Sequence, residues 1–86
     1  MKPVGAALAK EFGPHGITVN IVSPGPIMGE AQDPLMATHI RPMAARVPVG
    51  RLGTPDEVAA LVDLLVSDGG AFINGQLLQV NGGAET

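Results

Sequence analysis

The most constraining feature of this sequence is a β-branched run that follows directly on a tight turn. Residues 17–22 (ITVNIV) are β-branched at five of six positions. Ile17, Val19 and Ile21 alternate onto one face, and Val22 adds apolar character to the other. A short run that is apolar on both faces is typical of a largely buried strand in a parallel sheet. We therefore expect a strand over residues 17–22.

A helix is expected immediately before this strand, over residues 1–13. Val4, Leu8 and Phe12 recur every four residues among alanines, and the Gly-Pro pair that opens the turn at 13–16 ends the helix. No capping residue precedes Val4, so the helix begins as if truncated. A helix, a turn and a buried strand form the second half of a β-α-β unit, whose first strand is missing from this sequence.

The clearest local signal is the capping box that opens a second helix, expected over residues 54–67. Thr54 is the N-cap, Pro55 is the first helical residue, and the side chain of Glu57 can reach back to the cap. The apolar stripe of this helix consists of Val58, Leu61, Val62 and Leu65. A last short strand is expected over residues 76–80, ended by an Asn-Gly-Gly turn.

Residues 28–50 form the least regular stretch. We expect a short helix capped at Asp33 that Pro42 interrupts, followed by another turn. Three of the four Met residues lie here. Methionine adapts to irregular surfaces, so these side chains either fill gaps beneath a loop, which we favour, or cover an apolar ligand.

Two strands do not make an independently stable sheet, so the expected α/β architecture implies a larger one. A chain of 86 residues usually needs disulfides, a metal or a partner to be stable. This one has no Cys and only two His, which excludes disulfides and leaves a poor ligand set for zinc. We therefore expect either a partner or a missing remainder of the sheet.

Charge and hydropathy exclude other classes. A net charge of −3, with five Lys and Arg scattered along the chain, gives no electrostatic footprint for nucleic acid. No apolar run approaches the roughly 20 residues of a membrane span, and the N-terminus lacks the apolar core of a signal peptide. A cytoplasmic location is the default expectation.

Three blocks of the sequence resemble the short-chain dehydrogenase/reductase family, in family order and spacing. They are residues 7–27, residues 50–59, and the set 67–68, 73–76 and 80–83. The resemblance implies a doubly wound Rossmann-type parallel sheet that transfers hydride between NAD or NADP and a carbonyl or alcohol substrate. It covers only the C-terminal part of the family, so residues 1–86 are expected to be a C-terminal fragment of one domain. Residues 28–50 match the family's substrate loop.

The family's catalytic residues are not expected in this chain. The family uses a Tyr and a Lys four residues apart, aided by a Ser, and a Gly-rich phosphate loop. The sequence has no Tyr and no G-x-G-x-x-G segment. Lys2 stands a few residues after the position of the family Lys. The resemblance therefore assigns no catalytic residue here.

One wall of the cofactor site remains. The resemblance places Pro24, Gly25, Pro26 and Ile27 beside the nicotinamide ring, with the backbone of Ile27 contacting the carboxamide. From the residues alone, this segment merely ends a strand. The family usually has a Thr hydroxyl on the cofactor where this sequence has Gly29, so that contact is lost.

Other polar residues receive structural roles. His39 is expected to be solvated, with a substrate contact as the alternative, and His15 has no assigned task. Arg51 and Asp68 recur in family motifs and are expected to brace loops or to pair locally, which is a structural role. Asn74 stands where the family commonly has Thr.

Two functions follow from the resemblance. The first is part of an NAD(P)-dependent oxidoreductase that is inactive alone. The alternative is a noncatalytic module that associates with full-length relatives through subunit-contact helices. In both cases we expect a homo-oligomer or association with related subunits, and no metal.

Overall fold

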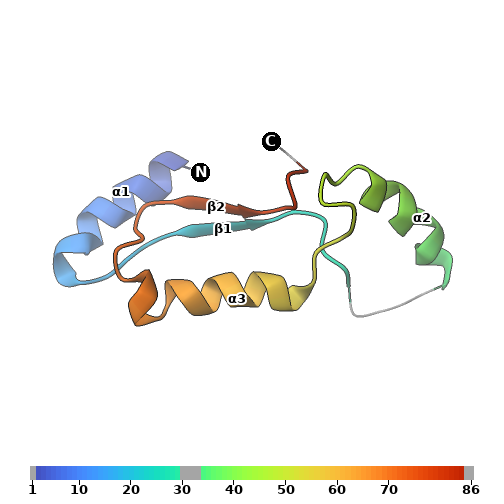
Figure 1. Ribbon diagram of the computed structural model, residues 1–86. Helices are drawn as coiled ribbons and strands as arrows, with labels where there is room; N and C mark the ends of the chain where they lie inside the picture. The colour runs from blue at the N-terminus through green and yellow to red at the C-terminus, as the bar shows by residue number, and fades with distance from the viewer. Residues whose placement is uncertain (1, 30–33, 85–86) are drawn as a thin grey trace. The chain divides into compact units, whose positions relative to one another are not determined.

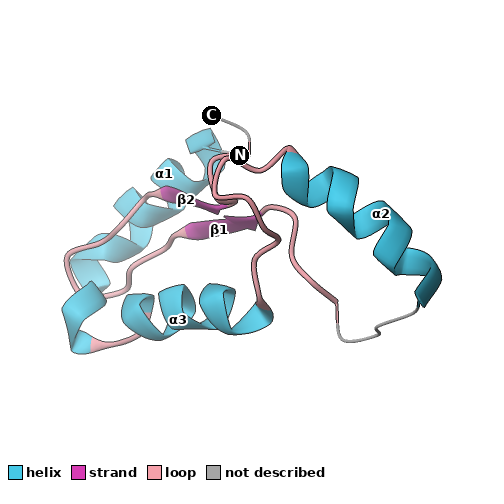
Figure 2. Cartoon of the chain, turned by 45° about the vertical axis from the view of Figure 1, so that its right-hand side comes forward, coloured by secondary structure: helices cyan, strands magenta, loops and turns pink. Residues whose placement is uncertain are grey.

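The computed structural model describes residues 2–29 and 34–84. Along the chain it contains α1 (Lys2–Phe12), the 3₁₀ turn η1 (Gly13–His15), β1 (Ile21–Pro24), α2 (Pro34–Ala45), α3 (Pro55–Leu65), the 3₁₀ turn η2 (Asp68–Gly70) and β2 (Leu77–Val80). β1 and β2 lie side by side in a two-stranded sheet (Figure 2). The chain divides into two compact units, residues 1–23 with 60–79 and residues 24–59 with 80–86.

The two strands run parallel. The N–H of Ile21 donates to the carbonyl of Gln76 at 2.9 Å, and the N–H of Gly25 donates to the carbonyl of Val80 at 2.9 Å. From the first hydrogen bond to the second, the donor and the acceptor each move four residues toward the C-terminus. This is the register of parallel strands. Parallel neighbours need a crossover connection, and the segment between the strands supplies one that contains α3.

Within the first unit, helices cover both faces of the strand. α1 lies on one side and the C-terminal half of α3 on the other (Figure 1). Gly5 of α1 lies so close to Ile21 that a Cβ at Gly5 would be 3.1 Å from Cδ1 of Ile21. Val22, the next residue along, lines a hollow together with Val62 and Leu65 of α3. Successive side chains therefore face opposite helices, in the alternation expected from the sequence.

β1 begins at Ile21, whereas the sequence predicts a strand from Ile17. The N–H of Val19 donates to Oδ1 of Asn74 at 2.8 Å. The carbonyl of Val19 accepts a hydrogen bond from the N–H of Gly75 at 2.8 Å. A side-chain amide thus stands where a partner strand would offer its backbone, so the regular ladder starts only after this point.

α2 runs through Pro42 without a break, so the predicted interruption is wrong. Proline removes one N–H donor, and Pro42 stands three residues before the end of the helix at Ala45. The missing hydrogen bond is the one from position 42 to the carbonyl of Thr38, four residues earlier, and the helix continues for one turn beyond this loss. The cap expected at Asp33 lies outside the described residues. The second predicted helix is shorter than expected, because α3 begins at Pro55 and ends at Leu65.

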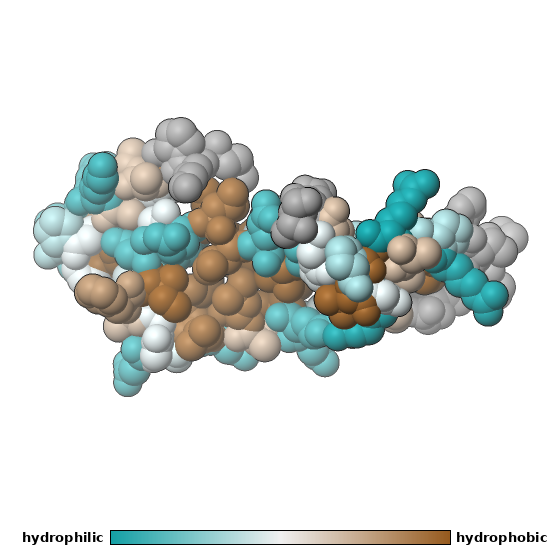
Figure 3. Space-filling model, turned by 45° about the horizontal axis from the view of Figure 1, so that its top comes forward, coloured by the Kyte–Doolittle hydropathy of each residue, from teal (hydrophilic) through white to brown (hydrophobic). Residues whose placement is uncertain are grey.

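Few apolar side chains are buried. Within the described residues the buried ones are Ala9, Val47 and Leu52. The larger side chains of α1 are exposed, Val4 at 62%, Leu8 at 38% and Phe12 at 37%. Hydrophobic side chains also gather over the strands beside α1 (Figure 3). α1 therefore packs through its small residues and leaves its apolar stripe open.

Every helix within residues 2–29 and 34–84 is too short or too polar to cross a lipid bilayer.

Candidate functional site

The four residues expected to meet a cofactor begin at the last residue of β1 and belong to the second unit. Gly25 lies against the end of β2: a Cβ on Gly25 would be 2.5 Å from the Cβ of Asn81 and 2.8 Å from its Cα. Real Cβ atoms do not approach this closely, so only glycine fits. A side chain at position 25 would thus collide with the residue that follows β2. From the sequence alone, the expected reason for this glycine was the close approach of a ligand to the loop.

The next residues form a parallel bridge with a distant segment. Ile27 pairs with Gly53. The N–H of Gly53 donates to the carbonyl of Pro26 at 2.9 Å, and the N–H of Met28 donates to the carbonyl of Gly53 at 2.8 Å. A Cβ on Gly53 would be 2.8 Å from Cδ1 of Ile27. The backbone on either side of Ile27 is therefore bonded to Gly53, and the side chain of Ile27 packs against Gly53.

The bridge leaves the backbone groups of Ile27 open. In a parallel bridge the residues on either side of Ile27 make the hydrogen bonds, so its own N–H and carbonyl point away from Gly53. No residue in the described ranges bonds to either group. One donor and one acceptor thus stand next to each other on a fixed loop. A primary carboxamide, which carries both an acceptor oxygen and donor N–H groups, complements such a pair.

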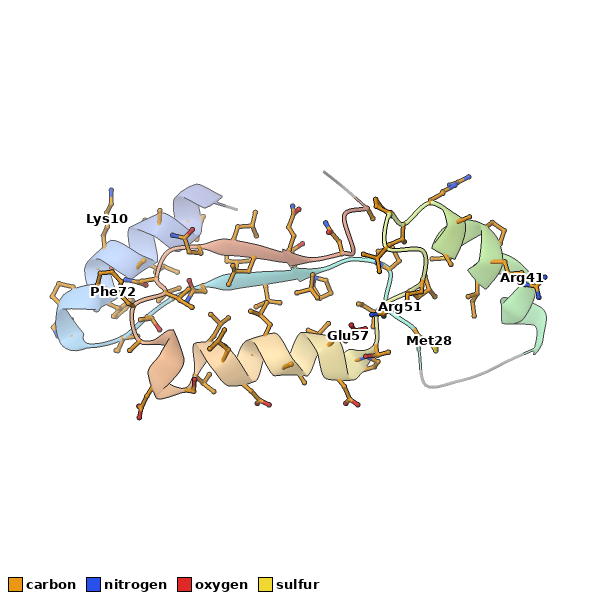
Figure 4. All side chains as sticks on the ribbon, viewed as in Figure 1. Lys10, Met28, Arg41, Arg51, Glu57 and Phe72 are labelled. Atoms are coloured by element: carbon orange, nitrogen blue, oxygen red, sulfur yellow. The ribbon has the colours of Figure 1, made fainter. Side chains whose placement is uncertain are left out.

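An ion pair stands beside this bridge, at the start of α3. The two side chains of Arg51 and Glu57 point toward one another, with Met28 close by (Figure 4). Nη1 of Arg51 is 2.7 Å from Oε1 of Glu57, and Nη2 is 2.9 Å from Oε2. This two-point geometry is the strong form of an Arg–carboxylate pair. The hydrogen bond from Arg51, together with the backbone N–H of Thr54, lowers the pKa of Glu57 from 4.5 to about 2. The same hydrogen bond raises the pKa of Arg51.

Glu57 also completes the capping box read from the sequence. Its Oε1 accepts the N–H of Thr54 at 3.0 Å, and its own N–H donates to Oγ1 of Thr54 at 3.2 Å. The brace expected from Arg51 is therefore real, and its partner is this cap. The spacing of six residues between Arg51 and Glu57 follows no helical or strand rule, so the sequence pattern did not identify Glu57 as the partner of Arg51.

A small hollow lies next to the ion pair within the second unit. Its volume is about 110 Å³, and its walls include Pro26, Gly53, Arg51, Glu57, Val80 and Asn81. Sites for small molecules usually measure about 300–1,000 Å³. The hollow of this unit alone is too small for a dinucleotide.

The remaining polar residues show no built site. The ring of His15 is exposed in η1, and the side chain of His39 lies outside the described part of α2. No cluster of metal-ligating side chains is present among the described residues. Met28 and Met43 are exposed, so the gap-filling interpretation is wrong for these two.

Asn74 has a larger structural role than the sequence suggested. Its Oδ1 accepts the N–H of Val19, and its Nδ2 donates to the carbonyl of Ala9 at 3.4 Å. One amide side chain thus joins α1 to the segment before β1. The Asn-Gly pair marks a turn, but it does not reveal these partners, which lie 55 and 65 residues away.

Comparison with known proteins places the chain within one large group of enzymes. The family model described as enoyl-(acyl carrier protein) reductase matches residues 3–85. The 3-oxoacyl-[acyl-carrier-protein] reductase FabG of Pseudomonas aeruginosa is 42% identical over 77 residues, covering 90% of this chain and 31% of FabG. The NADPH-dependent aldehyde reductase-like protein, chloroplastic, of Arabidopsis thaliana is 46% identical over 77 residues, covering 88% of this chain and 28% of the relative. The chain thus spans just under a third of the length of these curated relatives.

The fold is shared with a solved structure. The short-chain dehydrogenase/reductase SDR:Glucose/ribitol dehydrogenase from Brucella melitensis superposes with a TM-score of 0.83 at 34% identity, covering 99% of this chain and 34% of that one. The similarity confirms the fold class expected from the sequence, a portion of a doubly wound, Rossmann-type α/β sheet.

Proposed function

Because the chain belongs to the short-chain dehydrogenase/reductase family, we propose that it forms the C-terminal part of an NAD(P)-dependent oxidoreductase domain. In this proposal the enzyme transfers hydride between the nicotinamide ring and a carbonyl or alcohol substrate. Residues 24–27 form one wall of the cofactor site, and residues 28–50 belong to the substrate loop. The names of the relatives, a 3-oxoacyl reductase and an NADPH-dependent aldehyde reductase-like protein, support a carbonyl substrate.

The observation that carries the proposal is the open backbone pair of Ile27. Its N–H and carbonyl have no partner in the described part of the chain, while the residues on both sides are tied to Gly53. A nicotinamide carboxamide can accept from the first group and donate to the second. The ring it carries supplies or takes up the hydride. Rigid backbone groups orient such a ligand at little entropic cost.

We further propose that the 86-residue chain alone does not catalyse the reaction. The sequence has no Tyr to serve as the family's proton donor. The resemblance places the phosphate loop and the catalytic Ser, Tyr and Lys before the matched residues. NAD and NADP are distinguished in that same part of the family, so both remain candidates for the cofactor.

A chimera tests the proposal. The matched 77 residues of Pseudomonas FabG are replaced by their counterparts from this chain. We expect the chimera to consume reduced nicotinamide cofactor with a 3-oxoacyl substrate, and we expect the isolated chain to show no turnover. A folded chimera without turnover, or turnover by the chain alone, contradicts the proposal.

A backbone substitution in the chimera tests the carboxamide contact. Ile27→Pro removes the N–H of Ile27 and keeps its carbonyl, whereas Ile27→Val keeps both groups. Losing one hydrogen bond to a bound ligand costs about 0.5–1.5 kcal/mol, so we expect the KM for cofactor to rise about twofold to thirteenfold with Ile27→Pro. The Ile27→Val control should stay near the parent value. Equal KM values for both variants would refute the contact.

The second candidate function is a noncatalytic module that associates with related subunits. It is favoured by the exposed stripe of Val4, Leu8 and Phe12 on α1, since such a stripe marks an interaction surface when it is continuous. Co-purification of the chain with Pseudomonas FabG tests it. We expect Leu8→Asp to abolish co-purification and Lys10→Asp, a neighbouring charge change off the stripe, to leave it intact. No co-purification of the unaltered chain removes this candidate.

A further inference from the structure

Arg51 and Glu57 form a two-point ion pair at an exposed site. The two side chains are 56% and 43% exposed. Ion pairs at such exposed sites usually add little to stability, because water and salt screen them. Yet both Nη atoms of Arg51 are engaged, and Nη1 also donates to the carbonyl of Leu52 at 3.1 Å. Through these contacts the side chain of Arg51 is bonded both to the backbone of Leu52 and to Glu57 in the first turn of α3.

The segment between the contacts of Glu57 runs from Arg51 to Thr54. Glu57 bonds to Arg51 at one end of the segment and to the N–H of Thr54 at the other. Between these ends, the side chain of Leu52 is buried. Gly53 therefore lies in a four-residue segment that is anchored on both sides.

Gly53 is the residue that pairs with Ile27. It makes both bridge hydrogen bonds, at 2.9 and 2.8 Å, and its missing Cβ makes room for Cδ1 of Ile27. Whatever fixes Gly53 therefore also fixes the direction of the open N–H and carbonyl of Ile27. The chain of contacts runs from the ion pair through Thr54 and Gly53 to Ile27.

We propose that Arg51 and Glu57 are positioning residues that hold the backbone of Ile27 in place for the nicotinamide carboxamide. The proposal rests on the proposed function for its ligand. Its first part, the control of the Ile27–Gly53 bridge by the ion pair, stands on this chain alone. Neither residue touches the cofactor in this scheme.

Amide hydrogen exchange of the isotope-labelled full chain tests the first part. Exchange at Met28 N–H and Gly53 N–H reports opening of the bridge, and exchange at Gly25 N–H, bonded to Val80, reports opening elsewhere in the same unit. In Arg51→Met the cap between Thr54 and Glu57 is kept and the ion pair is lost. We expect the two bridge amides to exchange about threefold to fivefold faster, the size that a well-formed exposed ion pair can supply. Gly25 N–H should be unchanged.

Two further variants separate positioning from simple helix capping. Glu57→Gln keeps an acceptor for the cap and loses the charge, so it should behave like Arg51→Met. Arg51→Lys restores the charge at a single point, so it should recover part of the protection. Unchanged bridge amides in Arg51→Met and Glu57→Gln, or equal acceleration at Gly25 N–H, would overturn the inference.

The chimera with Pseudomonas FabG tests the second part. Arg51→Met should raise the KM for cofactor by the same threefold to fivefold and change kcat less, with partial rescue by Arg51→Lys. Faster bridge exchange with an unchanged KM would overturn the positioning role and leave the cofactor proposal standing. A chimera that is folded but inactive before any substitution instead refutes the proposed function, whatever the exchange data show.

Discussion

Gly25→Ala adds one methyl group to the chain. Among substitutions that add one methyl group within residues 24–29, we expect this one to be the most destabilising. The added Cβ would stand 2.5 Å from the Cβ of Asn81, and ordinary contact begins at 3.4 Å. The ends of β1 and β2 must therefore separate by about 1 Å, the difference between these distances. The hydrogen bond from Gly25 to Val80, now 2.9 Å long, would then exceed hydrogen-bonding distance.

The expected cost combines two effects. Overpacking costs about 1–3 kcal/mol, and the lost hydrogen bond adds about 1 kcal/mol. A total of about 2 kcal/mol or more lowers the Tm of a domain of this size by about 8–16 °C. The sequence has no Trp or Tyr, so unfolding is followed by far-ultraviolet circular dichroism in urea and on heating.

Gly29→Ala is the matched control. Among the residues that the structure describes, none lies within 4 Å of a Cβ built at Gly29, and its φ is not positive, so the alanine variant should stay within about 0.5 kcal/mol of the parent chain. If Gly25→Ala is as mild as this control, the close approach between the ends of the two strands is not present in solution.

Three other perturbations have defined outcomes. Thr54→Ala removes the side-chain cap of α3 and should cost about 1 kcal/mol in urea unfolding, whereas Thr54→Ser should cost little. The pKa of Glu57 is lowered from 4.5 to about 2 in the folded chain, so its contribution to stability is complete above about pH 4.5 and is lost as the pH falls toward 2. Urea midpoints measured from pH 7 to pH 2 should show this loss, and Glu57→Gln should show less of it. Asn74→Leu leaves the Val19 N–H without an acceptor and should cost about 1–3 kcal/mol, with partial recovery in Asn74→Asp, which keeps an acceptor oxygen.

The exposed apolar stripe of α1 shows what hydrophobic periodicity predicts and what it does not. The four-residue spacing of Val4, Leu8 and Phe12 correctly indicated a helix, because helical periodicity is a local property. It did not indicate which face packs on the sheet. The packing face is formed by Gly5 and Ala9, since small residues let the helix approach Ile21 closely. The larger side chains of Val4, Leu8 and Phe12 stay exposed in the described part of the chain.

The sequence by itself determined the features whose partners lie within one or two turns of each other. The capping box of Thr54 and Glu57, and the end of α1 at Phe12 before the Gly-Pro pair, depend on neighbours a few residues away, so their chemistry is visible in the order of the residues. The family blocks likewise located the four residues of the proposed cofactor wall. The sequence pattern was misleading at Pro42, where the helix tolerated the loss of one hydrogen bond, and at Ile17, because the regular strand starts only at Ile21.

Only the tertiary structure decided how that wall is held. Gly25 meets Asn81, and Ile27 pairs with Gly53, across 56 and 26 positions of the chain. Such pairings arise when the strand ends and the start of α3 come together, and no spacing rule connects residues so far apart. For the same reason the open N–H and carbonyl of Ile27, the groups on which the proposed function depends, became visible only when their neighbours' partners were known.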